Sequence, residues 1–173
     1  VSYGAGTKLG PKEIINASHY VEFYDEELNK ELCFDLGICT LEELKFKNLS
    51  HSKSLKKIND AVAKLLNDDK FVVTLGGEHS LSSAPIKAHF DKFKNMSVLQ
   101  IDAHSDLRDS YEGSKYSHAR VMARVAEFTK DIVQVGIRAQ CIDESVFIKD
   151  NNINTFYDRD IKSGKHGEKW QDK

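Results

Sequence analysis

Proline, cysteine and tryptophan are scarce in this chain of 173 residues, which contains two, three and one of them respectively. With so little proline, no proline-rich linker divides the sequence, and we treat residues 1–173 as a single domain. The cysteines, Cys33, Cys39 and Cys141, are odd in number and form no CxxC pair. This argues against a disulfide scaffold and a thiolate zinc site, so all three are interpreted as reduced and structural.

Long apolar runs and a strong excess of charge are also missing. No stretch approaches the ~20 apolar residues that cross a bilayer, and residues 1–10 lack the charged start and apolar centre of a signal peptide. We therefore expect a cytoplasmic protein without a membrane partner. The formal net charge is only -2, although 30% of the residues are charged, which disfavours nucleic acid as a partner. A nucleotide-binding domain is poorly supported, because neither GxGxxG nor GxxxxGK[ST] occurs.

Apolar residues follow helical spacing in some segments and form short continuous runs in others, and their share of 40% is sufficient for a core. Helices are predicted over residues 12–24, 52–69, 80–93 and 116–129, and strands over residues 31–39, 71–75, 97–101, 131–137 and 153–157. The second helix has the clearest pattern, since its apolar residues recur every three or four positions. Alternating strands and helices predict an α/β fold, with a parallel sheet and helices packed on its faces.

Metal-binding residue types directly follow two of the predicted strands. The strand over 71–75 is followed by GGEHS (76–80), and the strand over 97–101 by DAHSD (102–106). Ligands of parallel sheets bind beyond the carboxyl ends of the strands, which is where both segments lie. Two histidines and two carboxylates without a thiolate suit manganese, with zinc, iron and cobalt as alternatives. The candidate ligands are His79, Asp102, His104 and Asp106.

The spacing within DAHSD also predicts the shape of the chain there. If the segment were fully extended, the α-carbons of Asp102 and Asp106 would lie ~13 Å apart, too far for their side chains to share a compact site. The strand should therefore end near Asp102 and curl. A single Asp or His after a strand is usually a capping or loop residue, but two such clusters after successive strands favour a metal site. Four ligands are too few for two six-coordinate ions, so either one ion binds or further ligands come from elsewhere.

Four segments together resemble the ureohydrolase family of arginases and agmatinases, and bacterial agmatinases in particular. They are GGEHS, IDAHSDLRDSYEG, SHARVMARV and VGIR. The resemblance covers nearly the whole chain, and DAHxD is its most specific part. It implies an arginase-like, three-layer α-β-α fold with a parallel sheet, and a homo-oligomeric assembly.

The resemblance also implies a binuclear manganese hydrolase. His79 and Asp106 would bind one Mn²⁺, His104 the second, and Asp102 would bridge them, while His118 matches an active-site histidine that shuttles protons or contacts substrate. A hydroxide bridging the two ions would attack the guanidinium carbon of a small guanidino substrate and give urea and an amine. The stretch LRDSYEG resembles agmatinases rather than arginases. The expected substrate is therefore agmatine, which yields putrescine in polyamine biosynthesis, with arginine and guanidinobutyrate as the alternatives.

The chain departs from the family pattern at its ends. A later strand ending in DxDxxDP, which provides two more carboxylate ligands, and a Gly-rich substrate loop are both missing. The sequence also begins at Val1 rather than Met and stops in the polar stretch SGKHGEKWQDK. We therefore expect a partial ureohydrolase domain, truncated at both ends and incomplete on its C-terminal side. The second hypothesis is a non-catalytic fragment or subunit that retains half of the metal site.

Overall fold

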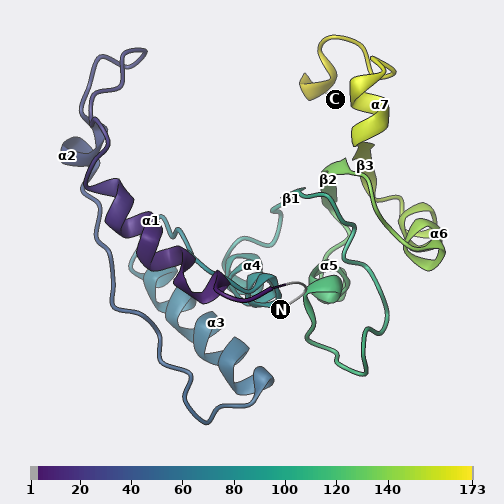
Figure 1. The fold of residues 1–173 in the computed structure, drawn as a ribbon, viewed down its shortest axis with the longest axis horizontal. Helices are drawn as coiled ribbons and strands as arrows, with labels where there is room; N and C mark the ends of the chain where they lie inside the picture. Colours follow the sequence, from purple (N-terminus) through teal and green to yellow (C-terminus); the bar gives the residue numbers. More distant parts are fainter. Residues whose placement is uncertain (1–3, 173) are drawn as a thin grey trace.

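Three parallel strands form a sheet in the C-terminal half of the chain (Figure 1). The computed structural model describes residues 4–172. The strands are β1 (Val98–Ile101), β2 (Ile132–Ile137) and β3 (Asn154–Tyr157), in the order β1-β2-β3. Helix α5 (Val121–Val125) lies in the connection from β1 to β2, and α6 (Ile142–Asp150) in that from β2 to β3. The predicted α/β class with a parallel sheet is confirmed.

Residues 4–172 form five further α-helices, and the longest of them has 17 residues. They are α1 (Gly10–Ser18), α2 (Leu32–Leu36), α3 (His51–Asn67), α4 (Ser83–Lys92) and α7 (Asp158–Lys162), with 3-10 turns at η1 (Thr7–Leu9), η2 (His79–Ser82), η3 (His118–Arg120) and η4 (Trp170–Asp172). The helices predicted over 80–93 and 116–129 each form as a 3-10 turn followed by an α-helix. Helices α6 and α7 were not predicted from the sequence. None of the helices among residues 4–172 has the length and apolar character needed to cross a membrane.

The prediction of a strand over residues 31–39 is wrong, because residues 32–36 of this apolar run form the short helix α2. The helix stops at Gly37, whose φ of 73° interrupts helical geometry. Figure 1 shows α2 at the far end of the molecule from the sheet, so within residues 4–172 no strand of the sheet lies beside this run. Helix α1 likewise ends at Ser18, six residues before the predicted end at residue 24.

Helix α3 forms as its spacing predicts, and it is capped by the preceding Ser50, whose hydroxyl accepts a hydrogen bond from the Lys53 amide at 3.4 Å. It packs beside α4 (Figure 1). The buried residues at this contact are Ile58, Val62 and Leu66 from α3 with Ala84 and Ala88 from α4. Each fully buried large aliphatic side chain contributes about 1.5–3 kcal/mol, and the small alanines let the two helices approach closely.

Residues 71–75 form no strand, so the prediction of a strand buried on both faces is also wrong. Phe71 is 96% exposed and Val73 is 71% exposed. A strand needs a neighbour for its backbone N–H and C=O groups, and within residues 4–172 none lies beside this segment. The outer edge of β1 is similarly unpaired, and Leu99 and Ile101 on its open face are 62% and 78% exposed.

The opposite face of the sheet is covered by helices and holds an apolar core. Its apolar core joins Val98 of β1 and Ile132 of β2 to side chains of α5 and α6, among them Met122 and Ile148. Along β1, burial alternates with each residue, so Gln100 lies on the same covered face as Val98. On this face, β1 therefore begins with the apolar Val98 and continues with the polar Gln100, two residues before DAHSD begins.

Candidate metal centre

The chain turns sharply where β1 ends. Asp106 adopts a φ of 54°, in the left-handed region that Asp tolerates better than most residues. The amide of Asp102 still donates to the carbonyl of Val135 at 3.0 Å, which continues the pairing with β2 for one residue. The predicted curl after Ile101 is confirmed, and it brings Asp102 and Asp106 to the same side of the turn.

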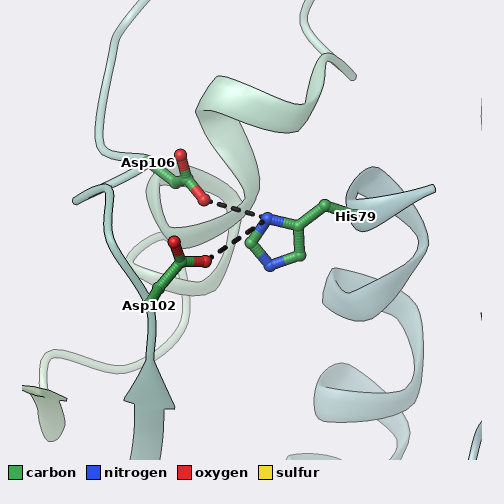
Figure 2. A group of neighbouring side chains, drawn as sticks. All are labelled: His79, Asp102 and Asp106. Carbon is green, nitrogen blue, oxygen red and sulfur yellow. Dashed lines mark ion pairs between the residues drawn. The ribbon is translucent and has the colours of Figure 1, made fainter. Parts of the chain in front are cut away.

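Three of the predicted ligands meet in space (Figure 2). Nδ1 of His79 lies 2.9 Å from Oδ2 of Asp106 and 3.8 Å from Oδ2 of Asp102. One ligand atom from each of the three residues lies within 4.8 Å of the other two. One imidazole nitrogen and two carboxylate oxygens without sulfur form a donor set for a divalent cation such as manganese or zinc. The three residues are therefore placed to hold one metal ion.

His104 lies beside this group rather than within it. Its side chain is 65% exposed, compared with 7% for Asp106. Nδ1 of His104 is 3.7 Å from Oδ1 of Asp102, and its amide donates to the same oxygen at 2.9 Å. Asp102 consequently presents one carboxylate oxygen to His79 and the other to His104. A second metal position would have two protein donors among residues 4–172.

All five predicted site residues line one cavity of about 400 Å³. His118 enters it from the start of η3, and its ring lies 5.2 Å from that of Tyr111 in an edge-to-face arrangement. Four further polar or aromatic residues line this cavity but were not predicted from the sequence as site residues. They are Arg108, Tyr111, Gln140 and Glu144. The geometry thus joins the 3-10 turns at His79 and His118 to the DAHSD turn.

Glu144 is a second buried carboxylate in this cavity wall, in addition to Asp106. Its Oε1 accepts from the Leu107 amide at 3.0 Å, and its Oε2 accepts from the Cys141 amide at 2.7 Å. Nε of Arg108 lies 3.7 Å from the same Oε2. Glu144 therefore connects the first turn of α6 to the residue after Asp106. Its bond to Cys141 is local, since a Glu in the first turn of a helix commonly caps the helix start, whereas its bond to Leu107 spans 37 residues.

The electrostatics of the cluster favour an added positive charge. The hydrogen bond to Asp106 raises the pKa of His79, although burial of the imidazole opposes this rise. Burial raises the pKa of Asp106, and the nearby His79 offsets this effect only in part. The protein alone does not fully stabilise the ionised Asp106 carboxylate, and a bound cation would do so.

Gly77, just before His79, is required because another part of the backbone passes very close. A Cβ on Gly77 would lie 2.1 Å from the carbonyl oxygen of Thr7 and 2.5 Å from its carbon. We expect Gly77→Ala to lower the free energy of unfolding by about 1–3 kcal/mol, as overpacking does. Thermal unfolding measures this, with Gly10→Ala as control, since Gly10 has φ -50° and no atom near its Cβ position. Equal unfolding temperatures for the two variants would show that the Thr7 contact is dispensable.

A parallel sheet with a cluster of imidazole and carboxylate groups beyond the end of β1 defines an α/β protein with a candidate divalent-metal centre. The chain belongs to the Arginase family, whose model matches residues 1–170. The resemblance inferred from GGEHS and DAHSD is confirmed.

The chain is similar in sequence to proteins named as ureohydrolases and agmatinases. An N(1)-aminopropylagmatine ureohydrolase of Synechocystis is 38% identical over 165 residues, which cover 92% of this chain and 54% of the relative. The agmatinase of Bacillus cereus is 35% identical, with 90% of this chain and 54% of the relative covered. The chain spans about half the length of these relatives.

Solved structures show the same fold. The agmatine ureohydrolase of Thermoplasma volcanium superimposes with a TM-score of 0.83 at 28% identity, covering 93% of this chain and 54% of that one. A putative agmatinase from Clostridium difficile gives a TM-score of 0.82 at 29% identity, covering 91% and 58%. The arginase-like architecture expected from the sequence is thereby confirmed.

Proposed function

We propose that this protein is a manganese-dependent hydrolase that releases urea from a small guanidino compound, with agmatine as the preferred substrate and putrescine as the amine product. The observation that carries the proposal is the convergence of His79, Asp102 and Asp106 within 4.8 Å in a chain of the Arginase family. The proposal includes cytoplasmic action in polyamine biosynthesis, a homo-oligomeric assembly and a single partial domain over residues 1–173.

The arrangement of the donors supports a proposed metal role for each residue. His79 and Asp106 would hold one ion, His104 would hold the other, and the two oxygens of Asp102 would bridge them. Bound divalent cations lower the pKa of water enough to provide a nucleophile near neutral pH. Manganese fits a site of carboxylates and imidazoles, and the raised pKa of Asp106 agrees with a site shaped for a cation.

The rest of the cavity would bind the substrate and provide the proton for the leaving amine. Its volume of about 400 Å³ accommodates a small guanidino compound. His118 lines the same wall and would deliver a proton to the leaving amine, which must gain one when the C–N bond breaks. Nε of Arg120 donates to the Arg108 carbonyl at 3.0 Å, and this bond would help to hold the loop that places Tyr111 beside His118.

Two alternatives have support. N(1)-aminopropylagmatine is a second candidate substrate, because the Synechocystis relative at 38% identity is named for it. The second alternative is a non-catalytic chain, because the second metal position has only Asp102 and His104 as donors among residues 4–172.

Urea release tests the proposal. The chain alone and a fusion to the C-terminal part of the Bacillus cereus agmatinase would be assayed with Mn²⁺ on agmatine, N(1)-aminopropylagmatine, arginine and guanidinobutyrate. We expect the fusion to act on agmatine and the chain alone to be inactive, since the second position lacks donors. A fusion carrying Asp102→Asn controls for contaminating enzymes.

The outcomes separate the hypotheses. Turnover by the chain alone would show that further carboxylates are unnecessary. A folded, manganese-loaded fusion that is inert towards all four substrates would contradict the proposed function. If the fusion prefers N(1)-aminopropylagmatine, the proposed reaction stands and only the proposed substrate is wrong.

A further inference from the structure

Three polar side chains stand in register across the sheet. Gln100 of β1 pairs with Gln134 of β2, and Gln134 pairs with Thr155 of β3. Gln134 is completely buried and Gln100 nearly so, on the face that otherwise holds the apolar core. Burying an amide without a partner costs roughly 1–3 kcal/mol in proteins, so these groups must be hydrogen-bonded to be tolerated.

The hydrogen bonds of this row lead to the DAHSD turn. Nε2 of Gln134 donates to Oε1 of Gln100 at 2.6 Å and to the carbonyl of Ser105 at 2.9 Å. Nε2 of Gln100 donates to the carbonyl of His104 at 3.1 Å. Thr155 completes the row by donating from Oγ1 to Oε1 of Gln134 at 3.1 Å. Two consecutive carbonyls between Asp102 and Asp106 are thus held by buried amides.

The centre of the turn is anchored through its side chain as well. Ser105 is completely buried, and its Oγ donates to Oε1 of Gln140 at 2.6 Å. Nε2 of Gln140 in turn donates to the hydroxyl of Tyr157 at 3.2 Å. Ser105 therefore points down into the protein, while its neighbours His104 and Asp106 carry the candidate ligand groups.

We propose that Gln100 and Gln134 are positioning residues of the metal centre, a buried amide pair that fixes the carbonyls of His104 and Ser105 and so sets where the His104 imidazole and the Asp106 carboxylate lie. This inference rests on the proposed metal function. A leucine would occupy a similar volume in the sheet but would leave the turn carbonyls unpaired. The pair thus acts on the turn in addition to joining β1 to β2.

Gln134→Leu and Thr155→Val separate these two effects. Both remove hydrogen bonds from the row, but only Gln134→Leu removes a donor to the turn. In the metal-free chain, we expect the hydrogen-bonded amides of His104 and Leu107 to exchange with solvent at least about tenfold faster in Gln134→Leu and at unchanged rates in Thr155→Val, as measured by NMR. We expect Mn²⁺ affinity, followed by the EPR signal of free Mn²⁺, to fall about 10- to 100-fold in Gln134→Leu alone.

Equal effects of the two variants on exchange and affinity would overturn the proposal, because the row would then only hold the sheet together. If Gln134→Leu does not fold, Gln100→Met provides the same comparison, since it removes the donor to the His104 carbonyl. If the unsubstituted chain and the fusion both fail to bind Mn²⁺, the proposed function is wrong, and the exchange rates in the metal-free chain still decide whether the amides position the turn.

Discussion

Asp106→Asn is expected to remove most of the stabilisation by manganese while leaving the metal-free protein as stable as before or more stable. Asparagine keeps the size of the side chain but removes a charged ligand from the group of three. If Mn²⁺ at 100 times its Kd stabilises the protein by about 2.7 kcal/mol, a 100-fold weaker site retains only about 0.4 kcal/mol. Most of the metal-induced rise in unfolding temperature should therefore be lost.

The metal-free result follows from the pKa of Asp106. Because burial raises this pKa above its unfolded value, the folded state binds the proton more tightly than the unfolded chain does. The contribution of Asp106 to stability consequently falls as the pH rises through the folded pKa, and its ionised form opposes folding at neutral pH. Asparagine carries no charge and adopts a φ of 54° at least as readily as aspartate.

Thermal unfolding with Mn²⁺ and with EDTA measures both effects. Asp109→Asn is the matched control, since this carboxylate belongs to the same loop but is fully exposed and does not line the cavity. The control should retain the full manganese-induced rise. If Asp106→Asn retains it too, Asp106 is not a ligand. If Asp106→Asn lowers the unfolding temperature in EDTA, its ion pair with His79 stabilises the fold more than burial destabilises it.

Glu144→Ala is expected to cause the largest loss of stability without metal. The substitution leaves the amides of Leu107 and Cys141 without their acceptor. Each buried group left unsatisfied costs about 1–3 kcal/mol. At about 2–4 °C per kcal/mol for a chain of this size, the unfolding temperature should fall by several degrees or more.

Two further variants test the hydrogen bonds of Glu144 specifically. Glu144→Gln retains one acceptor oxygen, so its unfolding temperature should lie between those of the unsubstituted protein and Glu144→Ala. Asp143→Asn removes an exposed carboxylate from the same helical turn and should cost about 0.3–1 kcal/mol through the helix dipole. Unfolding temperatures for Glu144→Ala no lower than for Asp143→Asn would refute the stabilising role of Glu144.

Local patterns predicted those elements that meet their partners within the described chain. The four-residue spacing of Ile58, Val62 and Leu66 specified α3, and the short apolar runs at 97–101 and 131–137 became β1 and β2. Residues 31–39 and 71–75 are equally apolar but form no strand. A strand depends on a neighbour that satisfies its backbone, which composition alone does not reveal.

The site was predictable to a similar extent. The DAHSD motif at a strand end identified Asp102 and Asp106, and GGEHS identified His79, because these residue types bind metals where parallel strands end. Glu144 could not be found in this way, since it reaches Leu107 from 37 residues further along the chain. Its role depends on how α6 packs, and no spacing within either segment encodes that contact.

The sequence by itself therefore determined the family, the parallel α/β class and the chemical types of the candidate ligands. Only the tertiary structure decided which ligands meet: Nδ1 of His79 lies 2.9 Å from Asp106, whereas the neighbouring His104 is largely exposed. The reason is physical, because the distance between side chains on separate loops is set by packing, by a left-handed turn residue and by buried hydrogen bonds. These interactions join segments that are remote in the chain, so they arise only when the whole chain folds.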